Sequence, residues 1–260
     1  MAWWGKLAGG AFGFMFGGPL GAVAGAAFGH QFDKGLDQTG PVGVPPINER
    51  TQAAFFTATF AIMGSVAKVD GRISESEIAQ AKRIMGDMRL DADQRHAAMQ
   101  LFYTGKEDDF DLYGVVDEFR KECHRSTHLI RMFLEIQLMT VLADGVIHAK
   151  ERQLLYDIGE RLGIYRDELE HLLHLAEGFH DAGGPVSKTQ QLKDAHEILG
   201  VDKSATDAEV KKAYRRLMNQ HHPDKLVSKG LPEEMIGVAT EKTQQIKKAY
   251  DLVKEERKTS

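Results

Sequence analysis

An uncharged run near the amino terminus restricts the folding of this chain more than any other feature. Residues 7–29 carry no charged side chain over 23 positions, which is about the length that a helix needs to cross a bilayer. Trp3 and Trp4 precede the run, and tryptophan is common at membrane–water interfaces. The sequence therefore predicts a short extracytoplasmic segment over 1–6 and a single transmembrane helix over 7–29. A cleaved signal peptide with its site at Ala22-Val-Ala24 and a disordered glycine-rich tail are the alternatives.

Glycine recurs at every fourth position of this run. This spacing places the glycines in one stripe along a helix, where the backbone of another helix can approach closely. A glycine-rich helix is unstable in water, so the stripe is best explained by a lipid environment or a partner helix. We therefore expect two copies of the chain to dimerise through Gly9, Gly13, Gly17, Gly21, Gly25 and Gly29.

Residues 192–260 contain two helix-forming stretches separated by a proline. Thr206 and Glu209 have the spacing of a capping box, in which each side chain accepts a hydrogen bond from the other residue's backbone amide. Apolar residues then recur at helical spacing from Val210 to Leu217, and again from Ile246 to Val253. The two stretches therefore predict an antiparallel helical hairpin.

Pro223 sets the end of the first of these helices. It lacks an amide hydrogen and disfavours helical angles at His222, so the helix should end near His221. The tripeptide His222-Pro223-Asp224 is then exposed at the tip of the hairpin. A positive stripe lies largely off the apolar face of the same helix, at Lys211, Lys212, Arg215 and Arg216. A solvated basic hairpin without further role is the alternative interpretation.

The motifs around the tripeptide resemble those of DnaJ-type J domains. They are, in order, Asp194-Ala-His-Glu-Ile-Leu-Gly-Val201, Ala213-Tyr-Arg-Arg-Leu217, His221-His-Pro-Asp-Lys225 and Ile246-Lys-Lys-Ala-Tyr250. The resemblance implies a J domain over 192–260 that binds the ATP-bound form of a DnaK-type chaperone and stimulates its ATPase. It also implies that His222, Pro223 and Asp224 trigger hydrolysis and that basic residues steer docking, at Lys211, Lys212, Arg215, Arg216 and Lys225. His221 departs from the pattern, because many J domains carry tyrosine there, so we expect an altered affinity.

Composition excludes several other classes of function. The formal net charge is −5, and residues 192–260 hold 14 Lys and Arg against 12 Asp and Glu, so the remainder of the chain carries −7. This acidic balance gives no reason to expect nucleic-acid binding. Cys123 is the only cysteine, so the chain has no internal disulfide, as is usual in a reducing cytosol. We find no nucleophile–base motif and no phosphate-binding loop, and we expect neither an enzyme nor a bound cofactor.

The middle of the chain, over 50–177, is expected to be all-α. Helical periodicity is clear over Phe55–Val69, Ile78–Met88 and Leu129–Ala143, and no alternating strand pattern stands out. The Gly/Pro-rich stretch from Gly40 to Pro46 and the sequence Gly183-Gly-Pro185 predict linkers over 30–49 and 178–191.

An internal repeat with the pattern Asp-Gly-x-Ile-x-x-x-Glu begins at Asp70 and again at Asp144. It overlaps the second half of an EF-hand loop, but Val66 and Lys68 stand where the first copy would need its earlier ligands. We favour a turn that ends one helix and begins the next, and a metal site at Asp70 and Asp144 is the alternative. A second, less favoured metal candidate is the pair His171 and His174.

The paired helical hairpins of the middle region resemble the TerB-like domain of tellurite-resistance proteins. The order of anchor, TerB-like domain and carboxy-terminal J domain resembles the membrane-anchored DnaJ-like co-chaperones of Gram-negative bacteria. That resemblance implies a single-pass protein of the inner membrane with a periplasmic amino terminus and a cytoplasmic bulk. It also implies a regulatory co-chaperone that localises a DnaK-type chaperone to envelope clients, with a possible role in envelope stress or capsule signalling. The alternative is a membrane scaffold or metal-responsive sensor that acts mainly through the TerB-like domain.

Overall fold

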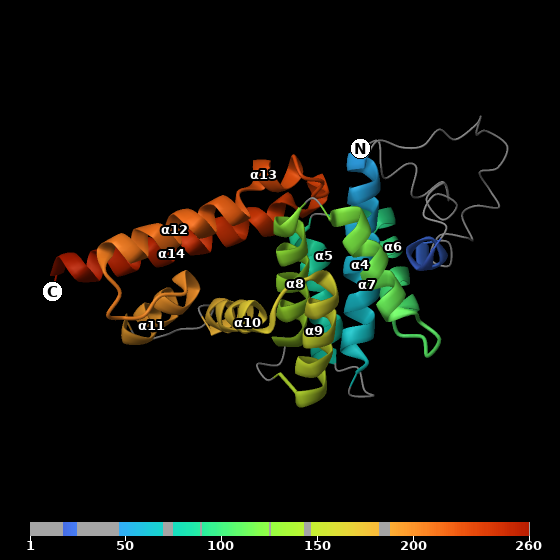
Figure 1. Ribbon diagram of the computed structural model, residues 1–260, viewed down its shortest axis with the longest axis horizontal. Coiled ribbons are helices and arrows are strands. Elements are labelled where there is room, and N and C mark those ends of the chain that lie inside the picture. Colours follow the sequence, from blue (N-terminus) through green and yellow to red (C-terminus); the bar gives the residue numbers. More distant parts are fainter. Residues whose placement is uncertain are drawn as a thin grey trace.

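The computed structural model describes residues 18–24, 47–69, 75–88, 90–124, 126–142, 147–181 and 188–259. Over these residues every regular element is a helix, so the all-α prediction is confirmed for the described part of the chain. A bundle of helices occupies one end of the molecule, and a long helical hairpin extends from it (Figure 1).

The bundle corresponds to the predicted middle domain. Its helices are α4 (Ile47–Ala67), α5 (Glu75–Asp87), α6 (Ala92–Thr104), α7 (Leu112–Cys123), α8 (Thr127–Val141), α9 (Ala149–Leu162) and α10 (Arg166–Asp181). Helix α4 lies at the centre, because it packs against α6, α7 and α8. Every residue from Ala53 to Met63 is buried, including Thr57 and Thr59, as expected for a helix enclosed on all sides. The three segments with predicted helical periodicity lie largely in α4, α5 and α8.

Small residues and aromatic rings fix how α4 meets its neighbours. A Cβ atom added at Gly64 would lie 1.9 Å from the carbonyl oxygen of Phe102, so only glycine permits α4 and α6 to approach this closely. On the other side, the ring of Phe119 packs between those of Phe55 and Phe133, at centroid distances of 6.0 and 4.6 Å. These contacts give the bundle a rigid aromatic core that joins α4, α7 and α8.

The carboxy-terminal hairpin has the two antiparallel arms that the sequence predicts. Its elements are α11 (Lys188–Leu199), α12 (Asp207–His221), α13 (Pro223–Val227), the 3₁₀ helix η2 (Glu233–Met235) and α14 (Ile236–Thr259). Helices α12 and α14 run antiparallel, and α11 packs against α14 (Figure 1). The predicted capping box is present at the start of α12: the Thr206 amide donates to Glu209 at 2.7 Å, and the Glu209 amide donates to the Thr206 hydroxyl at 3.3 Å.

The hairpin and the bundle share one continuous hydrophobic cluster. Helix α10 packs against both α8 and α11, and the tip of the hairpin lies against α8 (Figure 1). Helices also extend into the two predicted linkers: α4 already begins at Ile47, α10 continues to Asp181, and α11 begins at Lys188.

The predicted transmembrane helix lies mostly outside the described residues. Within 7–29 the structure describes only residues 18–24, of which 19–24 form a short helix. Among the described residues, no helix combines the length and the apolar character that crossing a bilayer requires.

Candidate functional site

The tripeptide His222-Pro223-Asp224 joins two helices at the tip of the hairpin. Helix α12 ends at His221, as predicted, and His222 is extended, with φ −62° and ψ 120°. Pro223 is the first residue of α13, where its missing amide hydrogen costs no hydrogen bond. The His222 carbonyl accepts hydrogen bonds from the amides of Lys225 and Leu226, both at 3.1 Å. The loop is therefore closed on itself by a short helix and held in one conformation.

Exposure divides this tip into a free face and an anchored face. His222 and Asp224 are exposed and Pro223 is half-buried, whereas Leu226 is buried in the hydrophobic cluster. Helix α13 is not among the predicted elements. The signal for it was Pro223 followed by Asp224 in the first turn, a favourable pair at a helix start.

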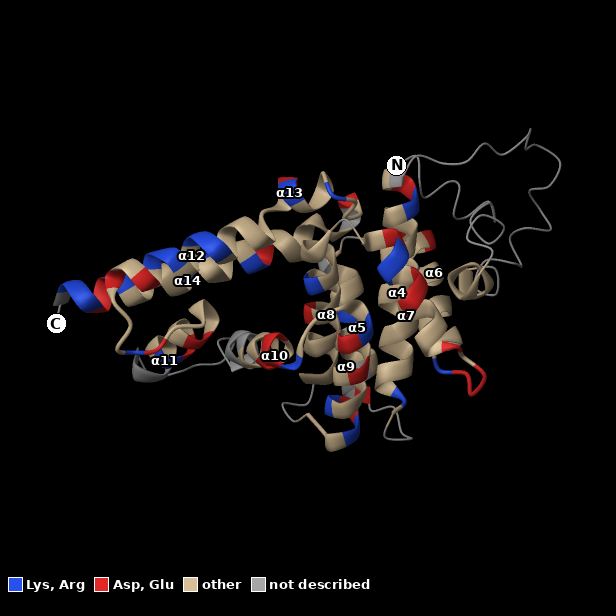
Figure 2. Cartoon of the chain, in the orientation of Figure 1, with Lys and Arg blue, Asp and Glu red and all other residues tan. Residues whose placement is uncertain are grey.

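The predicted basic stripe is present along α12. Lys211, Lys212, Arg215 and Arg216 are all exposed, while the opposite face of the helix is buried. In Figure 2, which colours Lys and Arg blue, much of the α12 ribbon is blue. Lys225 is also exposed, and its ammonium donates a hydrogen bond to the Asn219 side chain. The charge of Lys225 therefore lies beside the last turn of α12, which has no Lys or Arg of its own. It extends the basic band of α12 to the loop.

The segment after α13 rests on the middle domain. Gly230 has φ +104°, a backbone conformation that side chains disfavour. A Cβ atom there would lie 2.7 Å from Cγ2 of Thr51 at the start of α4 and 3.7 Å from Cδ1 of Leu129 in α8. The next residue, Leu231, is fully buried. The side of the tip away from the exposed tripeptide is thus packed against the bundle.

His221 is buried, in contrast to the exposed His222 that follows it. Its Nε2 atom lies 3.4 Å from Oε1 of Glu135, a residue in the middle of α8. The other carboxylate oxygen of Glu135 lies 2.6 Å from the ammonium of Lys242, on α14. All three side chains are at least nine-tenths buried. A carboxylate of the middle domain therefore contacts both arms of the hairpin at once.

The pKa values of this group follow from its burial and its partners. Burial alone would raise the pKa of Glu135, but His221 and Lys242 offset it and hold this pKa below its ordinary value. Burial also lowers the pKa of His221; Glu135 opposes this shift, and Lys242 adds to it. The two side chains that contact Glu135 therefore favour the charged form of its carboxylate against the effect of burial. Glu135 and Lys242 could not be paired from the sequence, because residues so distant along the chain carry no shared local pattern.

The candidate metal sites receive no support from the described residues. Asp70 and Asp144 lie outside them, and within them no group of His, Cys, Asp and Glu could hold a metal ion. Glu151, which closes the second copy of the repeat, accepts a hydrogen bond from the His148 amide at 2.7 Å and so caps α9. That contact agrees with the favoured interpretation of the repeat as a turn between helices.

His171 also lies next to the hairpin. Its Nε2 atom is 3.5 Å from the guanidinium of Arg216, and its ring packs against Gly200. Burial, and then the charge of Arg216, lower the pKa of His171. This side chain is a contact between α10 and the J-domain segment.

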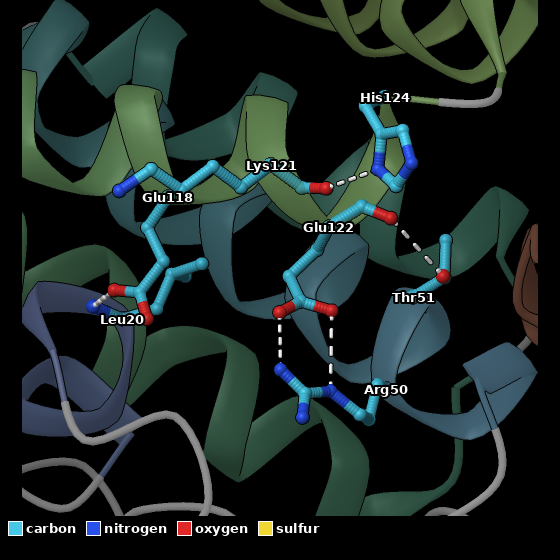
Figure 3. Close-up of polar contacts among 7 residues, drawn as sticks. All are labelled: Leu20, Arg50, Thr51, Glu118, Lys121, Glu122 and His124. Carbon is cyan, nitrogen blue, oxygen red and sulfur yellow. Dashed lines mark hydrogen bonds and ion pairs between the residues drawn. The ribbon is translucent and has the colours of Figure 1, made fainter.

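Two carboxylates on α7 hold the amino-terminal part of the described chain (Figure 3). Glu118 accepts a hydrogen bond from the Leu20 amide at 2.7 Å, which caps the helix over 19–24. One turn later, both carboxylate oxygens of Glu122 accept from the guanidinium of Arg50 at the start of α4. Of the six glycines in the predicted stripe, only Gly21 lies among the described residues, and it is buried.

Comparison with known proteins identifies each part of the chain. The family model of the co-chaperone DjlA transmembrane domain matches residues 1–39. The model of the tellurite resistance protein TerB matches residues 56–174, and that of the DnaJ domain matches residues 194–260. No solved structure matches the chain.

Similar proteins extend over the whole length. The co-chaperone protein DjlA of Photobacterium profundum is 43% identical over 273 residues, which cover 98% of this chain and 99% of that protein. Proteins of the same name from Yersinia pestis and Vibrio cholerae are 41% and 42% identical, covering 99% and 97% of this chain and 99% and 98% of their own lengths. The exposed tripeptide and its basic stripe lie within a DnaJ domain, the TerB match covers most of the bundle, and the chain belongs to the DjlA family of co-chaperones.

Proposed function

We propose that this chain is a regulatory co-chaperone that stimulates ATP hydrolysis by a DnaK-type chaperone in its ATP-bound form. One observation carries the proposal: His222 and Asp224 are exposed on a fixed tip that continues directly into the basic band of α12. A rigid, exposed loop can dock without losing much conformational freedom. The hydrolytic chemistry belongs to the partner, and the chain itself is a regulator.

The roles of the individual residues follow from this geometry. We assign His222, Pro223 and Asp224 to the trigger that contacts the chaperone. The exposed charges of Lys211, Lys212, Arg215, Arg216 and Lys225 attract a complementary acidic surface and raise the rate of encounter. Pro223 holds the two polar side chains on either side of it in a fixed relation, because its ring fixes φ.

The test is single-turnover hydrolysis of ATP by a purified DnaK-type chaperone in the presence of the full chain in detergent. Wild type should accelerate hydrolysis, and Asp224→Asn and His222→Gln should each lower the stimulation by about tenfold or more, as expected for a hot-spot contact. The matched control is Asp251→Asn, which removes an exposed carboxylate from α14 of the same domain. Equal stimulation by Asp224→Asn and wild type would refute the assignment.

We also propose that residues 7–29 anchor the chain in the bacterial inner membrane. The uncharged run and the match of 1–39 to a transmembrane-domain model support this proposal. In this structure, by contrast, residues 18–24 lie against α7, where the Leu20 amide donates to Glu118 and Leu20 is buried in the hydrophobic cluster. A DnaK-type partner needs ATP, so the TerB-like unit (50–177) and the J domain (192–260) are assigned to the cytoplasm and the amino terminus to the periplasm. Protease should then degrade these units in inverted membrane vesicles but not in intact spheroplasts. Degradation in spheroplasts would reverse the orientation.

Dimerisation through the glycine stripe is a separate proposal. Gly17→Ile/Gly21→Ile places two bulky side chains on the stripe and should abolish association in detergent, measured by sedimentation. Ala8→Ile/Phe12→Ile is the matched control, because it has the same spacing on the opposite face of the predicted helix. If the first variant still associates, the stripe is not the dimer contact. An anchored dimer would present two J domains to envelope clients and to stress or capsule signalling at the membrane.

A further inference from the structure

The contact between Glu135, His221 and Lys242 joins the two domains at the residue that precedes the exposed tripeptide. Glu135 belongs to the bundle, whereas His221 ends α12 and Lys242 lies near the start of α14. Their exposed fractions are 3, 5 and 4%, so water does not screen the charges. One carboxylate thus links the last turn of one arm of the hairpin to the first turns of the other.

Stability alone is a poor explanation for this arrangement. Desolvating two charges costs about as much as their attraction returns, and apolar residues of similar size often stabilise a fold at least as well. The hairpin is already held by its own apolar stripe and by the stacked rings of Tyr214 and Tyr250. The polar contacts add direction: Lys242 donates a hydrogen bond to one carboxylate oxygen of Glu135, and His221 lies 3.4 Å from the other, so the carboxylate fixes where the hairpin tip lies on α8.

Neighbouring contacts bear on the same tip. Gly230 touches Thr51 on one side of the loop, and Arg216 reaches His171 at the far side of α12. Both contacts are made with residues of the bundle. The tip therefore has several points of support on the middle domain, and Glu135 is the one that bonds to the residue adjoining His222.

We propose that Glu135 is a positioning residue for the chaperone trigger: through His221 and Lys242 it holds the His222-Pro223-Asp224 loop in the orientation that stimulates the partner. The inference rests on the proposed function of the J domain, and it makes the TerB-like domain a working part of the stimulating machinery. Glu135 itself is buried beneath the loop and acts through the two residues that it contacts.

The experiment uses the full chain in detergent and two readouts. The first is the rate of single-turnover ATP hydrolysis by a DnaK-type chaperone at increasing co-chaperone concentration, which separates maximal stimulation from half-saturating concentration. The second is amide hydrogen exchange of Lys225 and Leu226, whose amides bond to the His222 carbonyl. Exchange reports the closure of the loop without reference to activity.

Three variants are compared with wild type. Glu135→Gln removes the carboxylate that pairs with the buried Lys242. Lys242→Met removes the ammonium that pairs with the buried Glu135. Glu135→Gln/Lys242→Met removes both charges, so it should fold even if a single variant does not. We expect each folded variant to lower maximal stimulation about fivefold, with little change in the half-saturating concentration. The double variant should lose no more stimulation than the single variants, because the two residues act as one unit. Exchange of the two α13 amides should be about tenfold faster.

Gln137→Leu is the matched control. Gln137 is a buried polar residue on the same helix, but its side chain donates to the Thr59 carbonyl at 3.1 Å, inside the bundle. It should lower stability without changing stimulation or exchange in α13. The proposal is overturned if the folded double variant stimulates and exchanges like wild type, or if Gln137→Leu reproduces the loss. In either case wild type still stimulates and Asp224→Asn does not, so the proposed function stands; a wild type that fails to stimulate refutes the function itself.

Discussion

The ring of Tyr214 on α12 stacks on the ring of Tyr250 on α14, with centroids 4.2 Å apart and planes inclined by 18°. Both residues are half-buried and border the apolar stripe between the two helices. The stack lies well along the hairpin from the exposed loop, so it joins the arms without taking part in the tip. It is the clearest single contact that holds the arms together independently of the bundle.

Tyr214→Ala should therefore destabilise the J domain. We expect a loss of about 2 to 3 kcal/mol in the free energy of unfolding, because the burial of the Tyr214 ring and its stacking on Tyr250 are both lost. Urea denaturation followed by circular dichroism measures this loss. Tyr214→Phe keeps the stack and should change stability by less than about 0.5 kcal/mol. Equal losses in the two variants would show that the hydroxyl, not the ring, is what matters.

The basic band should act mainly on encounter. Lys211→Gln/Arg215→Gln should raise the half-saturating concentration for chaperone stimulation several-fold at low salt and less at high salt, because ions screen exposed charges beyond about 10 Å at 0.1 M. Lys247→Gln/Lys248→Gln removes the same charge from exposed positions on α14 and is the control. A defect that does not depend on salt would argue against electrostatic steering.

Acidification should loosen the junction between the domains. The pKa of His221 is lowered by burial, with Glu135 opposing this shift and Lys242, His128 and Arg131 adding to it. Folding therefore expels a proton that the unfolded chain binds near its ordinary pKa of about 6.5. The contribution of His221 to the free energy of unfolding is therefore complete above the pKa of the unfolded chain. It is lost as the pH falls from there toward the lower pKa of the folded protein.

A second histidine at the junction acts in the same direction. Burial lowers the pKa of His128, and the charges of Lys229, Arg131 and Lys225 lower it further. His128→Gln/His221→Gln should therefore flatten the fall in melting temperature between about pH 7 and pH 5. The exposed His96→Gln serves as control and should leave the slope unchanged. An unaltered slope in the double variant would place the pH sensitivity elsewhere.

Cys123 offers a probe of global opening. It is fully buried at the end of α7, and burial raises the pKa of its thiol, with Glu122 adding to the shift. Since the thiolate is the reactive species, native protein should react with a disulfide reagent only through opening of the bundle. The rate should rise to that of the unfolded chain across the denaturation transition. Rapid reaction of native protein would show that α7 opens locally.

Local features of the hairpin could be predicted because each depends on a few adjacent residues. The end of α12 followed from Pro223, the cap from Thr206 and Glu209, and the exposed stripe from helical spacing. The short helix α13 was missed, since a single turn leaves too few residues for a periodic pattern.

The junction between the domains could not be predicted. Glu135 and Lys242 are 107 residues apart, and each looks like an ordinary charged residue of an amphipathic helix until the fold buries both. His221 departs from the J-domain pattern, in which many members carry tyrosine. The side chain that it contacts is Glu135, a carboxylate of the other domain. Such pairs depend on how the helices dock, which local sequence does not encode.

The contact between Gly230 and Thr51 has a consequence for where the chaperone would work. It places the segment that follows α13 beside the start of α4, the point at which the chain arrives from the proposed anchor. Residues 30–46 lie between that anchor and α4, and even fully extended they reach no further than roughly 60 Å. If the proposed anchor holds, a chaperone recruited to the hairpin tip would be on a short tether next to the bilayer, where it would meet substrates that emerge from or assemble at the membrane.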